Sequence, residues 1–104
     1  MADPGIPEGL AVETVYVVEI SYMADAPQKR PAVRLEHLTR IGRLMAEGVL
    51  VDAGGFLDFS AALFIVRAGS ESEAIEIVRD DVYLRSGVWQ DDARARAFGL
   101  VRRA

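Results

Sequence analysis

Residues 14–22 of the chain, TVYVVEISY, are rich in β-branched and aromatic side chains. Such side chains fit a pleated surface, so this run predicts a β-strand, the first of the fold. Both faces of the strand are apolar, and a strand of this kind needs cover on both sides of its sheet. One face carries Val15 and Val17, and the other carries Tyr16, Val18 and Ile20.

The rest of the chain alternates between helical and extended patterns. Apolar residues recur at helical spacing from about Lys29 to Glu47, and Gly48 is placed to end this helix. Ser70 and Glu73 have the spacing of a capping box, which predicts a second helix over Ala74 to Arg79. Short apolar runs predict strands at 49–53, 62–67 and 95–101, while 81–89 is compact but has no regular period.

The predicted order is β-α-β-β-α-β, which folds into a ferredoxin-like α+β domain with a four-stranded antiparallel sheet. We assign residues 13–104 to this domain and the Pro- and Gly-rich residues 1–12 to a flexible leader. Both helices are expected on one face of the sheet. The other face is apolar as well and has no element left to cover it, so we expect a homodimer.

Charge and composition exclude several classes of partner. Lys and Arg number 12 and Asp and Glu number 16, a net charge of −4, which does not attract a nucleic acid. There is no cysteine, and no apolar stretch approaches the ~20 residues that cross a bilayer. The first residues also lack the pattern of a secretory signal. We expect a cytoplasmic protein whose partners include neither nucleic acid nor a membrane.

Patterns that bind cofactors are missing from the sequence. It contains neither Gly-x-Gly-x-x-Gly nor Gly-x-x-x-x-Gly-Lys, which form nucleotide-binding loops. It has a single histidine and scattered carboxylates, whereas a metal site needs clustered ligands. We therefore expect no cofactor and no bound metal.

His37 is the only histidine and the first candidate for chemistry. It lies beside the apolar stripe of the first predicted helix, one helical step after Arg34, so we expect it at the edge of the buried face. One interpretation is a histidine packed at the margin of the core or turned to solvent. The other is a proton-transfer residue, because imidazole takes and gives protons near neutral pH.

Asp81 follows the second predicted helix and is the second candidate. As a structural residue, it would cap the turn at Val82 and Tyr83 through its side chain. As a functional residue, it would hold one ring nitrogen of His37 so that the other nitrogen faces a substrate. The residues alone leave both interpretations open.

Blocks of sequence from about Val15 to Val101 resemble the YciI-like (YCII-related) family. The most specific are Arg34-Leu35-Glu36-His37-Leu38 and residues 81–89, DVYLRSGVW, with an Asp-x-Tyr and a Gly-Val-aromatic pattern. The resemblance implies a dimeric α+β barrel, in which two sheets pack face to face and cover each other. It also implies an active-site pair, His37 and Asp81, with a substrate-binding set of Arg34, Tyr83, Ser86, Gly87 and Trp89.

The chain departs from the family pattern at two places. Val82 stands where the family usually has proline, which frees a backbone N–H and would loosen the turn that holds Asp81. The segment from Gly55 to Ala61 lacks the glycine that often opens the third strand.

The resemblance also indicates a class of chemistry. A related member is similar to dehydrochlorinases that act on hydroxylated aromatic rings, and the wider superfamily includes muconolactone isomerases. This implies a lyase, isomerase or dehydrochlorinase-like enzyme that moves a proton on a small cyclic or carbonyl compound with His37 and Asp81. The alternative is a module that binds a small ligand or dimerises, without turnover. A hydrogen bond between His37 and Asp81 beside an open pocket would favour the enzyme.

Overall fold

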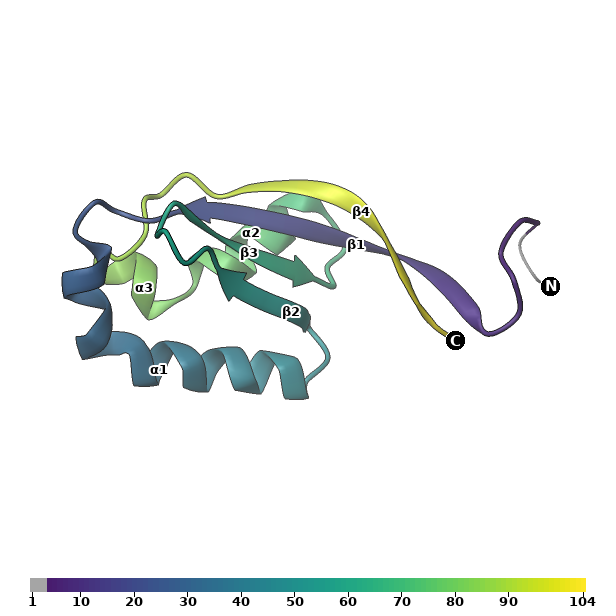
Figure 1. Cartoon of the computed structure of the whole chain (residues 1–104), viewed down its shortest axis with the longest axis horizontal. Helices are drawn as coiled ribbons and strands as arrows, with labels where there is room; N and C mark the ends of the chain where they lie inside the picture. The colour runs from purple at the N-terminus through teal and green to yellow at the C-terminus, as the bar shows by residue number, and fades with distance from the viewer. Residues whose placement is uncertain (1–3) are drawn as a thin grey trace.

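The computed structural model describes residues 4–104, which form one sheet flanked by helices (Figure 1). No helix in this range is long and apolar enough to cross a lipid bilayer. The predicted β-α-β-β-α-β order is present, with one short helix added in the aperiodic segment 81–89. The elements are β1 Leu10–Ser21, α1 Ala26–Ala46, β2 Leu50–Gly55, β3 Ala61–Val66, α2 Glu71–Arg79, α3 Val82–Arg85 and β4 Arg94–Arg103.

The sheet confirms the predicted fold class. Its strand order is β2-β3-β1-β4, and each neighbouring pair is antiparallel. The first strand is therefore central, paired with β3 on one side and β4 on the other. This interleaving of two β-α-β halves is the ferredoxin-like arrangement.

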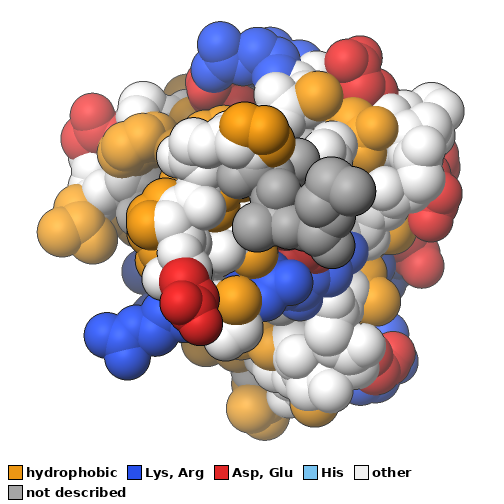
Figure 2. Space-filling model, turned by 90° about the vertical axis from the view of Figure 1, so that its right-hand side faces the viewer, with side chains coloured by type: hydrophobic (Ala, Val, Ile, Leu, Met, Phe, Trp, Pro, Cys, Tyr) orange, Lys and Arg blue, Asp and Glu red, His pale blue; other side chains and the backbone are white. Residues whose placement is uncertain are grey.

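β1 is longer than predicted. It begins at Leu10 rather than at Thr14, so Leu10 to Val12 belong to the sheet and not to the leader. They pair with β4 from Arg103 back to Val101, which satisfies backbone groups that a lone extended segment would leave unpaired. Figure 1 shows this pair continuing past the helices as a twisted arm. Seen from that end, hydrophobic side chains reach the surface among basic and acidic ones (Figure 2).

α1 is also longer than predicted at its start. It begins at Ala26 rather than near Lys29, with Pro27 in its first turn. Proline is tolerated there because the first N–H groups of a helix have no partner within the helix. Pro31 lies inside α1, and Figure 1 shows the helix bending after its first turns, which an internal proline explains. Gly48, with φ 76°, follows the helix end as predicted.

The predicted capping box at the start of α2 forms with one change of partner. Ser70 Oγ accepts the N–H of Glu73 at 3.1 Å. The Glu73 carboxylate accepts the N–H of Gly69 at 3.0 Å, instead of the N–H of Ser70. The cap sets the first turn, so α2 begins at Glu71, before the predicted Ala74.

The hydrophobic core lies between the sheet and the helices α1 and α2. Alternate residues of the central strands, such as Val18 and Phe64, face this side and are cross-strand partners. They belong to one buried cluster with Ile41 of α1 and Val78 of α2. Because both helices contribute to the same cluster, they cover the same face of the sheet, as predicted.

Within residues 4–104, the opposite face of the sheet has no helix over it and carries an apolar patch, with Glu19, Arg94 and Arg96 beside it. Val17 and its partner Ile65 lie on this face, with Leu63 and Phe98 beside them. These side chains line an open hollow of about 450 Å³. Phe98 keeps 45 % of its surface exposed. The second apolar face predicted from strand β1 is therefore present.

Candidate active site

Asp81 stands at the N-terminus of α3 and caps it. Its backbone is extended, with φ −141° and ψ 145°, and its Oδ1 accepts the N–H of Tyr83 at 2.8 Å. The cap satisfies a backbone donor that every helix start leaves free. This is the structural role considered for Asp81 from the sequence.

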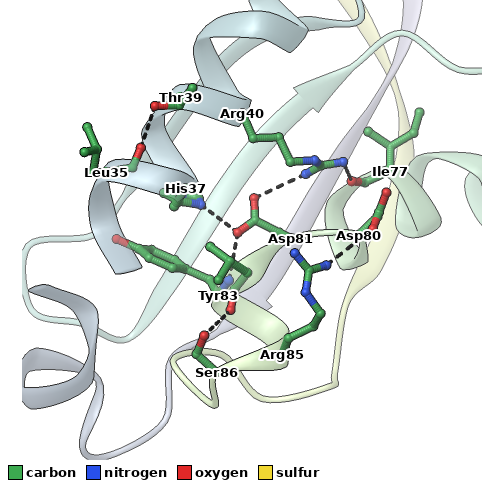
Figure 3. A network of polar contacts seen from close by, with 11 residues as sticks. Leu35, His37, Thr39, Arg40, Ile77, Asp80, Asp81, Tyr83, Arg85 and Ser86 are labelled. Atoms are coloured by element: carbon green, nitrogen blue, oxygen red, sulfur yellow. Dashed lines mark hydrogen bonds and ion pairs between the residues drawn. The ribbon is translucent and has the colours of Figure 1, made fainter. Parts of the chain in front are cut away.

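The same carboxylate also contacts His37 of α1, as Figure 3 shows. The ring Nδ1 lies 2.8 Å from Asp81 Oδ1. An ionised carboxylate can only accept a hydrogen bond, so Nδ1 carries the proton of the neutral ring and Nε2 keeps a lone pair. Asp81 is 1 % exposed and His37 8 %, so the pair is buried more deeply than the edge position that we expected.

Arg40 is a third member of this cluster that the sequence analysis missed (Figure 3). Its Nη1 donates to Asp81 Oδ2 at 3.2 Å, and its Nη2 donates to the carbonyl oxygen of Ile77 at 2.6 Å. Arg40 follows His37 by three positions, which places both side chains on one face of α1. That spacing is the sequence signal that points to it.

The donors around Asp81 keep its carboxyl group ionised. Burial by itself raises the pKa of Asp81, but the hydrogen bonds from His37, the Tyr83 amide and Arg40 outweigh it and lower the pKa below its usual value. A carboxylate in this state holds the proton on Nδ1 and stabilises a positive charge on the imidazole ring.

Two aromatic rings fix the plane of the imidazole. Tyr83 stacks on His37 with ring centroids 3.7 Å apart and 9° between the planes. Trp89 meets the ring edge-on, at 5.5 Å and 89°. Together with the hydrogen bond at Nδ1, these contacts restrict the rotation of the ring.

His37 lines a cavity of about 310 Å³ between α1 and the β2–β3 hairpin. A cavity of ~150 Å³ is enough for benzene, so this one has room for a substituted single ring. Two of the predicted substrate-binding residues, Arg34 and Tyr83, line the cavity. Tyr22 and Arg30 line it as well and were not predicted.

Residues 14–93 match the family model of the YCII-related domain. The chain belongs to the YCII-related family. Its structure is similar to that of 5-chloro-2-hydroxyhydroquinone dehydrochlorinase (TftG) from Burkholderia phenoliruptrix AC1100, solved in complex with 2,5-dihydroxybenzoquinone. The TM-score is 0.61 at 18% sequence identity, covering 86% of this chain and 92% of that one, a likeness of fold. No curated protein sequence gives a match.

The other substrate-binding residues implied by the family resemblance do not line the cavity. Ser86 Oγ donates to the carbonyl oxygen of Val82 at 2.6 Å, at the end of α3. Gly87 follows with φ 74°, a left-handed conformation that favours glycine. Trp89 packs against the His37 ring. Within residues 4–104, no three side chains of the usual metal-binding types gather into a site.

Val82, which replaces the usual proline of the family, is the first residue of α3. In the described chain its N–H donates no hydrogen bond outside the helix, and the extended Asp81 before it has the conformation that a following proline requires. The turn is not loosened, because Asp81 makes its bonds to His37, Arg40 and Tyr83.

We expect Val82→Pro to fold and to raise the free energy of unfolding by about 0.4–1 kcal/mol, because proline restricts the unfolded chain. Urea unfolding followed by circular dichroism measures the change. Leu84→Pro is the matched control: it removes the bond from Leu84 N–H to the Asp81 carbonyl and should cost ~3 kcal/mol. A loss of stability in Val82→Pro would show that Val82 itself holds the turn.

The lowered pKa of Asp81 also predicts how stability depends on pH. The unfolded chain binds a proton at this carboxyl more readily than the folded chain, so the stabilisation is complete above about pH 4 and is lost as the pH falls through the folded pKa. At neutral pH, we expect the free energy of unfolding of the wild type to exceed that of Asp81→Asn by about 1–3 kcal/mol. This difference should shrink in acid. Urea unfolding of both proteins from neutral pH down to about pH 2 tests this prediction. A difference in unfolding free energy that stayed constant over that range would contradict it.

Proposed function

We propose that the chain is an acid–base enzyme in which His37, oriented by Asp81, transfers a proton on a small cyclic or carbonyl compound. One observation carries this proposal: Nδ1 of His37 lies 2.8 Å from Asp81 Oδ1, and His37 lines an open cavity. With Nδ1 occupied, Nε2 is the atom left to act on a substrate.

The proposed reaction begins when Nε2 takes a proton from carbon or oxygen of the substrate. The electron pair of the broken bond enters the substrate, and the imidazolium that forms is stabilised by Asp81. In a lyase, that electron pair forms a double bond and expels a leaving group as an anion. In an isomerase, Nε2 returns the proton to a different atom. Both outcomes use the same first step.

The fold relative supports this class of chemistry. It is named as a dehydrochlorinase, and removal of hydrogen chloride from an organic molecule includes the loss of a proton. Its bound 2,5-dihydroxybenzoquinone is a single ring that carries oxygen atoms. The cavity beside His37 has the volume for a molecule of that size.

The alternative is a module that binds a ligand without turnover. A cavity that was filled or absent at His37 would have favoured it. The cavity is open, and the carboxylate at Nδ1 prepares His37 for proton transfer, which binding alone does not need. The enzyme is therefore the better-supported function.

We expect His37→Asn to lower kcat about 10²- to 10⁴-fold on whichever phenolic, lactone or halogenated ring compound is turned over. Asparagine places an amide nitrogen near the position of Nδ1, so it still donates to Asp81, but it has nothing in place of Nε2. Steady-state kinetics after a substrate screen measure the loss, and thermal unfolding shows that the variant is folded.

His37→Gln is the matched control. Its amide reaches toward the position of Nε2 but cannot take up a proton, so its activity should be lost equally. Full activity in either variant would make His37 a structural residue. Asp81→Asn should also lose activity, but it removes the charged partner of Arg40 and is the less specific variant.

We further propose that the protein is a homodimer whose two sheets face each other. The open face displays Val17, Leu63, Ile65 and Phe98 around an apolar hollow, and an exposed apolar patch of this kind marks an interface. The face is self-complementary in character, which suits a twofold axis.

Sedimentation equilibrium should give about twice the 11.4 kDa mass of the chain. Ile65→Lys places a charge in the middle of the proposed interface and should yield monomer. Leu35→Lys makes the same change at a position on α1 that is 84 % exposed, and it should stay dimeric. A wild-type monomer at micromolar concentration would rule out the barrel assembly.

A further inference from the structure

The cavity beside His37 is positively charged and lacks acidic side chains. Arg30 and Arg34 line it, and none of its lining residues is Asp or Glu. Neither arginine forms an ion pair with any carboxylate of residues 4–104, although arginines elsewhere, such as Arg67 and Arg79, do. Uncompensated positive charge beside apolar walls attracts an anion, because the field there is weakly screened.

Arg30 is held in place without being neutralised. Its guanidinium lies 4.7 Å from the ring centroid of Phe59, a cation–π contact. Phe59 has φ 60°, a conformation that is strained for a bulky residue, and the loop is fixed where Asp58 Oδ1 accepts the Ser60 N–H at 2.9 Å. The aromatic face of Phe59 stabilises the guanidinium without accepting a conventional hydrogen bond from it. The N–H groups of Arg30 can therefore donate to a ligand.

The hydroxyl of Tyr22 adds a third donor to the same cavity. Burial raises the pKa of Tyr22, against the opposing charges of Arg30 and Arg34, so the hydroxyl keeps its proton at neutral pH. The position depends on Gly55, because a Cβ there would lie 2.4 Å from the Tyr22 oxygen. The side chain of Tyr22 thus occupies space that only glycine leaves open.

The side chain of Trp89 lies near that of Tyr22. The backbones of Tyr22 and Trp89 pair as a β-bridge, and the indole N–H lowers the pKa of Tyr22 while falling short of hydrogen-bond geometry. This buried N–H has no other acceptor in the described chain and can only donate.

We propose that Arg30, Arg34 and Tyr22 form an oxyanion subsite, so that the substrate is a single-ring compound bearing a phenolate, enolate or carboxylate oxygen. The cavity of about 310 Å³ limits the ligand to roughly one substituted ring. The catalytic role of the subsite rests on the proposed function. In that function, His37 removes a proton from the substrate while Arg30, Arg34 and Tyr22 bind the negative oxygen. Binding of the anion itself does not require His37 to act.

Benzoate and benzamide are suitable probes because they have nearly the same shape and differ in charge. Isothermal titration calorimetry with the full chain should give at least about tenfold tighter binding of benzoate, as expected for charge-assisted hydrogen bonds. Arg30→Gln and Arg34→Gln should each weaken benzoate about tenfold and leave benzamide little changed. Tyr22→Phe should weaken benzoate severalfold.

Arg43→Gln is the matched control, because it removes the same charge from α1 at a position outside the cavity lining. It should leave both affinities unchanged, and thermal unfolding should show all variants folded. Equal affinity for the two probes, no measurable binding of benzoate, or insensitivity to both arginine variants would overturn the subsite.

His37→Asn separates the subsite from the proposed function. It should keep benzoate affinity within about twofold while turnover falls. If benzoate is preferred but His37→Asn retains full turnover, the subsite stands and the acid–base role fails. If turnover depends on His37 but benzoate is not preferred, the subsite alone fails.

Discussion

The site and the packing around it depend on one buried carboxylate. Asp81 is 1 % exposed, and a charge at such a position is tolerated only when hydrogen bonds replace the lost water. The ring of His37, the guanidinium of Arg40 and the amide of Tyr83 supply them. Two of these donors belong to α1 and one to α3, so the carboxylate joins the long helix to the short one. Removing the charge would therefore weaken both the hydrogen bond to His37 and the contact between the two helices.

Capping α3 and contacting His37 were alternatives in the sequence, and Asp81 makes both contacts. Oδ1 accepts the Tyr83 amide and the His37 ring at the same distance, 2.8 Å. The helix cap fixes the position of the carboxylate that is proposed to orient His37. The structural and functional interpretations were never exclusive, because a carboxylate has two oxygens and several lone pairs.

Hydrophobic pattern and cap chemistry were sufficient to predict the fold. The β-branched run at 14–22, Gly48 after α1 and the Ser70 cap are local signals, and all three appear in the structure. The errors fell where partners are distant or a local rule was too strict. Leu10 to Val12 carry no strand signal of their own and are extended because β4 pairs with them. α1 begins before the predicted Lys29, because Pro27 fits the first turn of a helix.

The site was only partly accessible from the sequence, for a similar reason. His37 and Asp81 are 44 positions apart, so no spacing rule links them, and family resemblance supplied the pair. Arg30, Arg34, His37 and Arg40 recur at helical steps, a pattern that would have placed them on one face of α1. Tyr22 gave no signal, since a tyrosine closing an apolar strand is indistinguishable from a core residue. Its hydroxyl lies against Gly55 of another strand, a contact that only the folded chain creates.

Strand β2 belongs both to the proposed dimer interface and to the wall of the cavity beside His37. Ala53 and Gly54 line the cavity beside His37 and also the hollow on the open face of the sheet. β2 is an edge strand, paired only with β3, and an edge strand without further cover is a weakly held part of a fold. A second copy packed on the open face would contact β2, which forms part of the wall of the cavity. Dimerisation would then stabilise the shape of the site, with no need for the partner to supply a catalytic residue.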